Sequence, residues 1–87
     1  MERGNRESTW LIVARCLAII RRVRQGPPPD WQGLVETVRA EVGKDAYGDA
    51  KGRALHKRVE NDLARIRKHL GIEIRYSRKE KGYIIVR

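Results

Sequence analysis

The stretch that most constrains the fold is residues 49–70, where apolar side chains recur at the spacing of one helical face. The stripe consists of Leu55, Val59, Leu63, Ile66 and Leu70. At 100° per residue these positions lie on one side of a helix. Asp49 can accept backbone N–H groups as an N-cap, and Gly71 can end the helix in the left-handed conformation. The sequence therefore predicts one long helix with an apolar side facing a core.

The opposite side of this predicted helix is basic. Its polar residues are Arg53, Lys57, Asn61, Arg65 and Lys68, with the small residues Ala50, Ala54 and Ala64 between them. Small residues between cations let a helix approach an anionic surface closely, whereas a solvated face more often mixes Glu with Lys as i,i+4 pairs. Two interpretations stay open at this point, a solvated helix face and a recognition helix.

The positive charge is concentrated in one half of the chain. Residues 51–87 contain twelve Lys or Arg and four Asp or Glu, a net charge of +8, whereas residues 1–50 carry +1. This distribution favours a folded face that binds a polyanion, with nucleic acid as the commonest partner. An anionic membrane surface is the weaker candidate, because the apolar stripe is needed for a core. We expect a single domain over residues 1–87, with residues 1–7 flexible.

A first helix is predicted after this polar start. Glu7, Ser8 and Thr9 offer N-cap side chains, and the helix runs to about Gln25. One side carries Trp10, Leu11, Ala14, Leu17 and Ala18, and the other carries Ile12, Val13, Cys16, Ile19, Ile20 and Val23. A helix that is apolar nearly all round is buried on two sides. We expect the second side to be buried either within the monomer or in a homodimer through this helix.

The same apolar run, residues 10–20, is too short to span a membrane, so no membrane partner is expected. Cys16 is the sole cysteine, so neither an internal disulfide nor a cysteine zinc site can form. We expect Cys16 to be a small buried hydrophobe in an intracellular protein.

The connector Gly26–Pro29 stops the first helix and is stiffened by three prolines. Asp30 can cap a second helix that Gly43 ends. Residues 44–48 form the loop into the long helix. For Tyr47 in that loop two interpretations stay open, packing as a lid and hydrogen bonding to a phosphate.

After Gly71 the chain predicts a β-hairpin. Residues 72–77 alternate apolar and polar side chains with the period of a half-buried strand, and 82–87 form a second strand. The charged residues 78–81 make a basic turn between them. The predicted order of three helices followed by a hairpin places the chain in the α+β class.

Three helices followed by a hairpin is the plan of a winged helix-turn-helix domain. The residues themselves resemble the N-terminal DNA-binding domain of DeoR-type and WYL-domain bacterial transcription regulators. The matching segments are Lys57–Leu63, Gly71–Ile74 and Gly82–Ile85. The resemblance covers about residues 9–87 and is most specific over 55–85.

This resemblance implies a double-stranded DNA-binding transcription regulator in the bacterial cytoplasm, associated with the nucleoid. Its recognition helix would be about residues 49–70, and its wing 72–87. Lys57, Arg58 and Asn61 replace the Arg, Thr and second Arg that are usual in the family. No effector domain follows the wing, so we expect a fragment of a larger regulator or a small stand-alone binder.

The candidate DNA-binding residues are cations and one amide on the long helix and the turn of the hairpin. They are Lys51, Arg53, Lys57, Arg58, Asn61, Arg65, Lys68, Arg78, Lys79 and Lys81. Arg53 or Lys57 can read guanine, and Asn61 can pair with adenine. Phosphate contacts are expected from the flank and the far end of the helix, and the wing is expected to meet phosphates or to enter the adjacent minor groove.

Other functional classes have little support. The sequence shows no metal-ligand spacing, phosphate-binding glycine loop or paired catalytic carboxylates, so we expect no enzyme, metal, cofactor or small-molecule site. We expect Asp62 to be a structural partner of a backbone amide or arginine, Tyr83 to pack on the long helix, and His56 and His69 to lie at the surface. Two alternatives stay open: a general RNA or architectural DNA binder, and a protein-interaction winged helix that uses the first helix.

Overall fold

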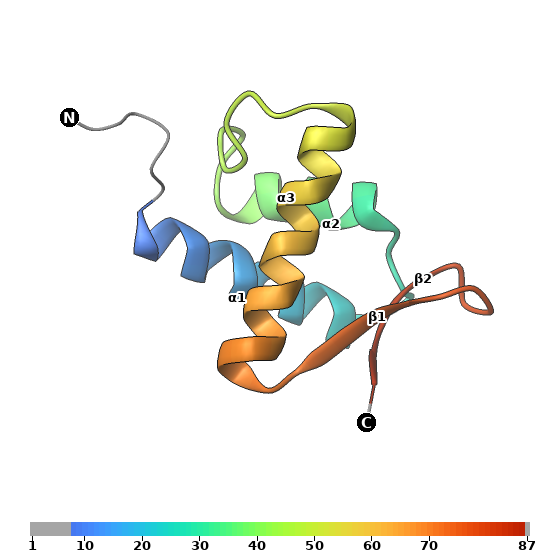
Figure 1. Ribbon diagram of the computed structural model, residues 1–87. Helices are drawn as coiled ribbons and strands as arrows, with labels where there is room; N and C mark the ends of the chain where they lie inside the picture. The colour runs from blue at the N-terminus through green and yellow to red at the C-terminus, as the bar shows by residue number, and fades with distance from the viewer. Residues whose placement is uncertain (1–7, 87) are drawn as a thin grey trace.

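The computed structural model describes residues 8–86, so the expected flexibility of residues 1–7 lies outside the described range. Its elements are α1 (Thr9–Gln25), α2 (Trp31–Glu41), α3 (Gly52–Arg65), a π-helical turn η1 (Ile66–Leu70), β1 (Glu73–Ser77) and β2 (Gly82–Val86). This order confirms the predicted α+β class, with three helices followed by an antiparallel hairpin. In Figure 1, α3 crosses in front of α1, and the hairpin extends away from the helices.

The first two helices begin where their capping residues predict. Ser8 Oγ accepts hydrogen bonds from the backbone N–H groups of Trp10 and Leu11, at 3.1 and 3.4 Å. Asp30 Oδ1 accepts one from the N–H of Gly33 at 2.7 Å. These bonds satisfy donors that the first turn of a helix leaves unpaired.

The predicted start of α3 is wrong. The helix begins at Gly52 with Lys51 in the cap position, and no side chain caps it. The chain reaches the helix later than Asp49 because the preceding loop packs inward, burying Ala46 and Tyr47. The packing interpretation of Tyr47 is therefore confirmed. Its interpretation as a phosphate contact is wrong, because the side chain is fully buried.

The predicted stripe holds along α3 but fails at its end. Leu55, Val59 and Ile66 are buried, whereas Leu70 is 53% exposed. The last turn is π-helical, and its wider i→i+5 repeat moves Leu70 off the stripe. Gly71 ends the turn with φ +68°, as predicted.

The hairpin is anchored to the connector between α1 and α2. Its register runs from Glu73 opposite Val86 to Ser77 opposite Gly82. The Tyr83 N–H donates to the carbonyl oxygen of Pro29 at 2.7 Å. A Cβ at Gly82 would lie 2.3 Å from the carbonyl oxygen of Pro28, so only glycine allows this close approach.

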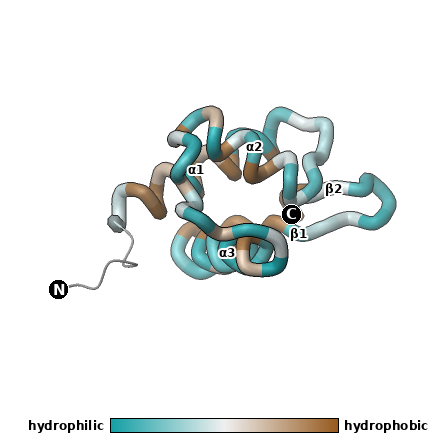
Figure 2. The backbone as a smooth tube through the Cα atoms, turned by 90° about the horizontal axis from the view of Figure 1, so that it is seen from above, coloured by the Kyte–Doolittle hydropathy of each residue, from teal (hydrophilic) through white to brown (hydrophobic). Residues whose placement is uncertain are grey.

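The core lies where the three helices and the inner side of the hairpin meet. Its fully buried apolar side chains include Ala18, Ile19, Leu34, Val38, Val59 and Ile66. Figure 2 shows a hydrophobic stretch near the start of α1, at the outer edge of the helices. Full burial of α1 within the monomer is therefore wrong, because Trp10 is 79% exposed and Leu17 46% exposed. Across residues 8–86, no helix has the length and apolar character needed to cross a membrane.

Candidate nucleic-acid interface

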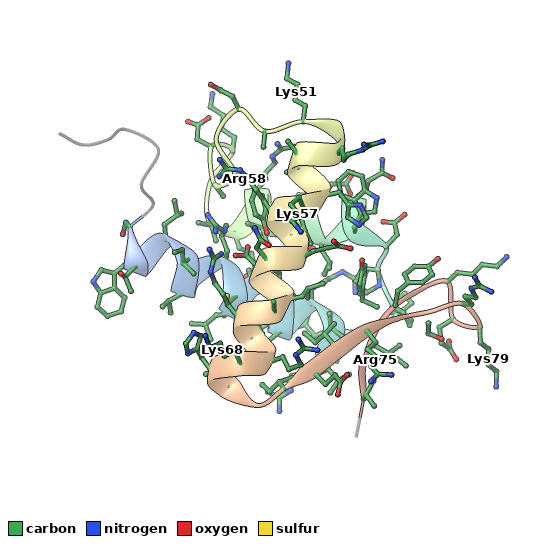
Figure 3. The ribbon with its side chains drawn as sticks, viewed as in Figure 1. Lys51, Lys57, Arg58, Lys68, Arg75 and Lys79 are labelled. Carbon is green, nitrogen blue, oxygen red and sulfur yellow. The ribbon has the colours of Figure 1, made fainter. Side chains whose placement is uncertain are left out.

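The side of α3 turned away from the core carries a row of exposed polar residues. Arg53, Lys57, Asn61 and Lys68 are all exposed. Their spacing follows the i,i+4 repeat of one helix face because the buried stripe occupies the opposite face. Figure 3 shows Lys57 on α3 and Lys68 on η1, which continues it, with Lys51 at the start of α3. The predicted residues are thus brought together on one surface, which we call the α3 row.

Small side chains interrupt this row. Ala54 and Ala64 are exposed between the longer residues, so the backbone is accessible there. One carboxylate, Glu60, lies at the edge of the row, and its Oε2 is 3.5 Å from Nε2 of His56. The imidazole of His56 also stacks on Trp31, with ring centroids 4.8 Å apart.

Arg58 and Arg65 are half-buried on the flank of α3. Arg65 Nη1 donates to Asp62 Oδ1 at 2.8 Å, so this guanidinium is held by an ion pair within the protein. The pair leaves 38% of the Arg65 side chain exposed. Arg65 can therefore offer remaining donors at the surface in a fixed orientation.

The turn of the hairpin is the second basic surface. Arg78, Lys79 and Lys81 are all exposed there, and Figure 3 shows Lys79 at the end of the hairpin farthest from the helices. The turn is shaped by Ser77, whose Oγ accepts a hydrogen bond from the Glu80 N–H at 3.1 Å. We call residues 78–81 the hairpin turn.

Two further exposed cations were missed by the sequence reasoning. Arg67 and Arg75 line an open hollow of about 460 Å³ between α3 and β1, together with Tyr76. Arg75 Nε donates to Glu73 Oε2 at 2.5 Å. The period-two alternation predicted that Arg75 lies on the polar side of a strand. It could not predict that this strand packs beside the long helix, which is what places Arg75 in the hollow. Arg67 lies between Arg65 and Lys68, which were both predicted to contact DNA, but no sequence pattern singled out Arg67 itself.

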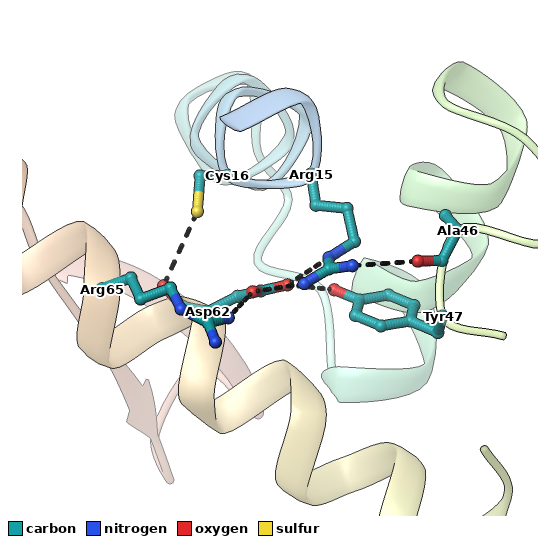
Figure 4. Close-up of polar contacts among 6 residues, drawn as sticks. All are labelled: Arg15, Cys16, Ala46, Tyr47, Asp62 and Arg65. Atoms are coloured by element: carbon teal, nitrogen blue, oxygen red, sulfur yellow. Dashed lines mark hydrogen bonds and ion pairs between the residues drawn. The ribbon is translucent and has the colours of Figure 1, made fainter. Parts of the chain in front are cut away.

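A buried polar cluster positions α3 from its inner side (Figure 4). It consists of Arg15, Cys16, Ala46, Tyr47, Asp62 and Arg65, and we call it the Arg15–Asp62 cluster. Arg15 Nε and Nη2 donate to the two carboxylate oxygens of Asp62, at 2.9 and 3.1 Å. Arg15 and Asp62 are 1% and 0% exposed. The predicted structural role of Asp62 is confirmed.

The remaining members connect this ion pair to the loop before α3. Arg15 Nη1 donates to the carbonyl oxygen of Ala46 at 3.0 Å, and the Tyr47 hydroxyl donates to Asp62 Oδ2 at 2.9 Å. The Arg15 guanidinium also lies 4.8 Å from the centre of the Tyr47 ring. α1, the loop and α3 are therefore joined around one carboxylate. This arrangement sets how far α3 is rotated about its axis.

Burial and charge change the titration of two members of the cluster. Burial of the thiol, followed by the negative charge of Asp62, raises the pKa of Cys16 to about 11. Burial also raises the pKa of the Tyr47 hydroxyl, with further contributions from the charge and hydrogen bond of Asp62. Both groups consequently keep their protons at neutral pH. Tyr47 thus remains a hydrogen-bond donor to Asp62.

Within residues 8–86, no group of three or more His, Cys, Asp or Glu side chains is arranged to hold a metal ion. The sequence was also compared with known proteins. A scan against protein-family models, a search of curated proteins and a search of solved structures each gave no match. A functional assignment therefore depends on the geometry of the α3 row and the hairpin turn.

Proposed function

We propose that this protein binds double-stranded DNA as a transcription regulator with a winged helix-turn-helix fold. In this proposal α2 and α3 form the helix-turn-helix, α3 is the recognition helix, and the β1–β2 hairpin is the wing. The observation that carries the proposal is the exposed α3 row, beside which the basic hairpin projects away from the helices (Figure 3). The protein would act in the cytoplasm, at the bacterial nucleoid.

The α3 row has the chemistry that major-groove reading requires. The major groove admits one α-helix, and its base edges are read by side chains with donors and acceptors. Arg53 or Lys57 supplies donors for guanine O6 and N7, and Asn61 supplies the paired donor and acceptor that adenine recognises. The exposed Ala54 and Ala64 leave room for the helix to lie deep in the groove.

The remaining cations support phosphate contacts on both sides of the groove. Lys51 lies at the start of α3, where no side chain occupies the backbone N–H groups of the first turn. Such groups bind phosphate oxygens well. Arg58, Arg65 and Lys68 are assigned to the phosphates beside α3. The hairpin turn is assigned to the backbone or the adjacent minor groove.

The proposal is tested by selecting bound DNA from a random-sequence duplex library, sequencing it, and repeating the selection at two salt concentrations. We expect an enriched motif together with salt-sensitive binding, because each neutralised phosphate contributes a slope of about −0.9 in log K against log salt. Salt-sensitive binding without a motif would overturn sequence-specific regulation and would leave the general nucleic-acid binder. Absence of binding to duplex DNA would overturn the proposal altogether.

Single substitutions separate the two assigned roles. Lys57→Ala and Asn61→Ala should lower preference for the selected site by roughly 1–3 kcal/mol each. Lys79→Ala should instead weaken binding to all duplexes alike and reduce the salt slope by about 1. Arg24→Ala is the control, because it removes one exposed cation from the last turn of α1, outside the α3 row and the hairpin turn. Equal losses on selected and random DNA for the first three variants would refute the groove assignment.

A further inference from the structure

An apolar groove lies between the first half of α1 and η1. It has a volume of about 420 Å³, and its apolar lining includes Ile12, Val13, Leu17, Ile66 and Leu70. Val13, Leu17 and Leu70 are 38%, 46% and 53% exposed. Large apolar side chains are thus left in water along one continuous groove. The π-helical turn contributes directly, because it moves Leu70 out of the core and onto the rim.

Trp10 projects beside this groove and is 79% exposed. It precedes Val13 by three residues and lies on the same exposed side of α1 as Leu17. With these exposed fractions, the four large side chains leave on the order of 400 Å² of apolar surface, the size at which a surface patch commonly marks an interaction site. The patch therefore combines a projecting indole with a hollow.

We propose that a second copy of this chain covers the patch, with Trp10 of each protomer inserted into the groove of the other. A two-fold interface uses the same surface on both subunits, so this surface must be self-complementary. A projection and a hollow side by side meet that requirement. Two such patches contribute on the order of 800 Å², about half of the ~1,600 Å² of a standard interface and in the range of weak, transient contacts, so the dimer should form only at high protein concentration.

Charge also favours a second copy over an acidic partner. Each chain carries a net charge of +9, so two copies can meet stably only on a face with little unpaired charge. The sequence from Thr9 to Ala14 contains no charged residue, and the cation in the groove lining, Arg65, is paired with Asp62. An acidic partner would be attracted to the exposed cations of the α3 row and hairpin turn, not to this groove.

The main test is the molar mass in solution, measured by sedimentation equilibrium over a wide range of protein concentration. We expect the wild-type chain, whose monomer mass is 10.1 kDa, to form a dimer as its concentration rises. Trp10→Ala should weaken dimerisation at least tenfold. Tyr76→Ala is the control, because it removes an exposed aromatic ring that lies on β1, outside the patch. A wild-type chain that stays monomeric at several hundred micromolar, or an unchanged dimer of Trp10→Ala, would overturn the proposal.

Tryptophan fluorescence gives a second, independent readout. Trp31→Phe leaves Trp10 as the sole tryptophan and preserves an aromatic ring beside His56. Its emission should shift to shorter wavelength as the dimer forms, and Leu17→Asp in the same background should abolish the shift. An emission maximum that does not change with concentration would contradict burial of Trp10. Neither measurement involves DNA, so failure of the dimer is distinguishable from failure of DNA binding.

Discussion

Replacement of Asp62 by asparagine tests whether the Arg15–Asp62 cluster stabilises the fold. The change is nearly isosteric, so it removes the negative charge without opening a cavity. The Asp62 carboxylate accepts four hydrogen bonds, two from Arg15 and one each from Tyr47 and Arg65. In the variant the buried Arg15 guanidinium loses the negative charge of Asp62.

The expected loss is large on the scale of a small domain. Removal of one partner from a buried ion pair costs about 3–5 kcal/mol, because an uncompensated buried charge remains. At roughly 0.05–0.15 kcal/mol per residue, a chain of this length has about 4–13 kcal/mol of folding free energy in total. Asp62→Asn should therefore lower the free energy of unfolding by about 3–5 kcal/mol, which is at least about a quarter of the total.

A double-mutant cycle shows whether the pair itself is the cause. Arg15→Met removes the buried cation while Asp62 keeps its bonds to Arg65 and Tyr47, so it should cost less than Asp62→Asn. In the double variant the buried cation is removed together with the carboxylate, so the loss should fall below the sum of the single losses by at least ~1.5 kcal/mol. The free energies are measured by urea unfolding followed by circular dichroism, with m-values compared between variants. A cost below about 1 kcal/mol for Asp62→Asn, or additivity within about 0.5 kcal/mol, would refute the reasoning.

Two further predictions concern the start of the helices and the titration of the cluster. Asp30→Ala should lower the free energy of unfolding by about 1 kcal/mol, because it removes the N-cap bond to Gly33. Asp49→Ala should change the free energy of unfolding by less than about 0.5 kcal/mol, because Asp49 caps no helix. Urea unfolding of both variants measures the difference, and equal losses would contradict it. The raised pKa values of Cys16 and Tyr47 mean that the unfolded state releases these protons first, so stability should be unaffected near pH 7 and should fall as the pH rises above about 9. Tyr47→Phe should show a smaller fall between pH 9 and pH 11 than the wild-type chain in the same unfolding assay, and an identical fall would show that Tyr47 does not contribute.

The order of the elements could be predicted from the sequence because their signals are local. Period-3.6 stripes, the cap at Asp30, the glycine at position 71 and the alternation of the two strands each depend on a few neighbouring residues. The same locality explains the exposed α3 row, since the positions opposite a buried stripe must face outward. Whether these positions contact DNA stays a prediction.

The sequence-based predictions failed where contacts between residues far apart in the sequence determine the structure. Arg15 lies in an apolar run, and its partner Asp62 is 47 positions away, so no local pattern could identify the pair. The same cluster draws Tyr47 inward and thereby delays the start of α3 beyond Asp49. The π-helical turn that exposes Leu70 likewise has no signature in the apolar spacing, which continues regularly through it.

The two parts of the candidate interface are attached to the core by separate routes. α3 is fixed from its inner side by Asp62, whereas the hairpin is fixed through the contacts of Gly82 and Tyr83 with the proline connector. Both routes lead back to α1, which carries Arg15 and continues into that connector. If α3 lies in the major groove and the hairpin on the backbone, α1 helps to hold their relative positions, together with the direct contact between β1 and η1. Pairing of α1 with a second copy would then place two such interfaces in a fixed symmetric relation, as a two-fold DNA site requires.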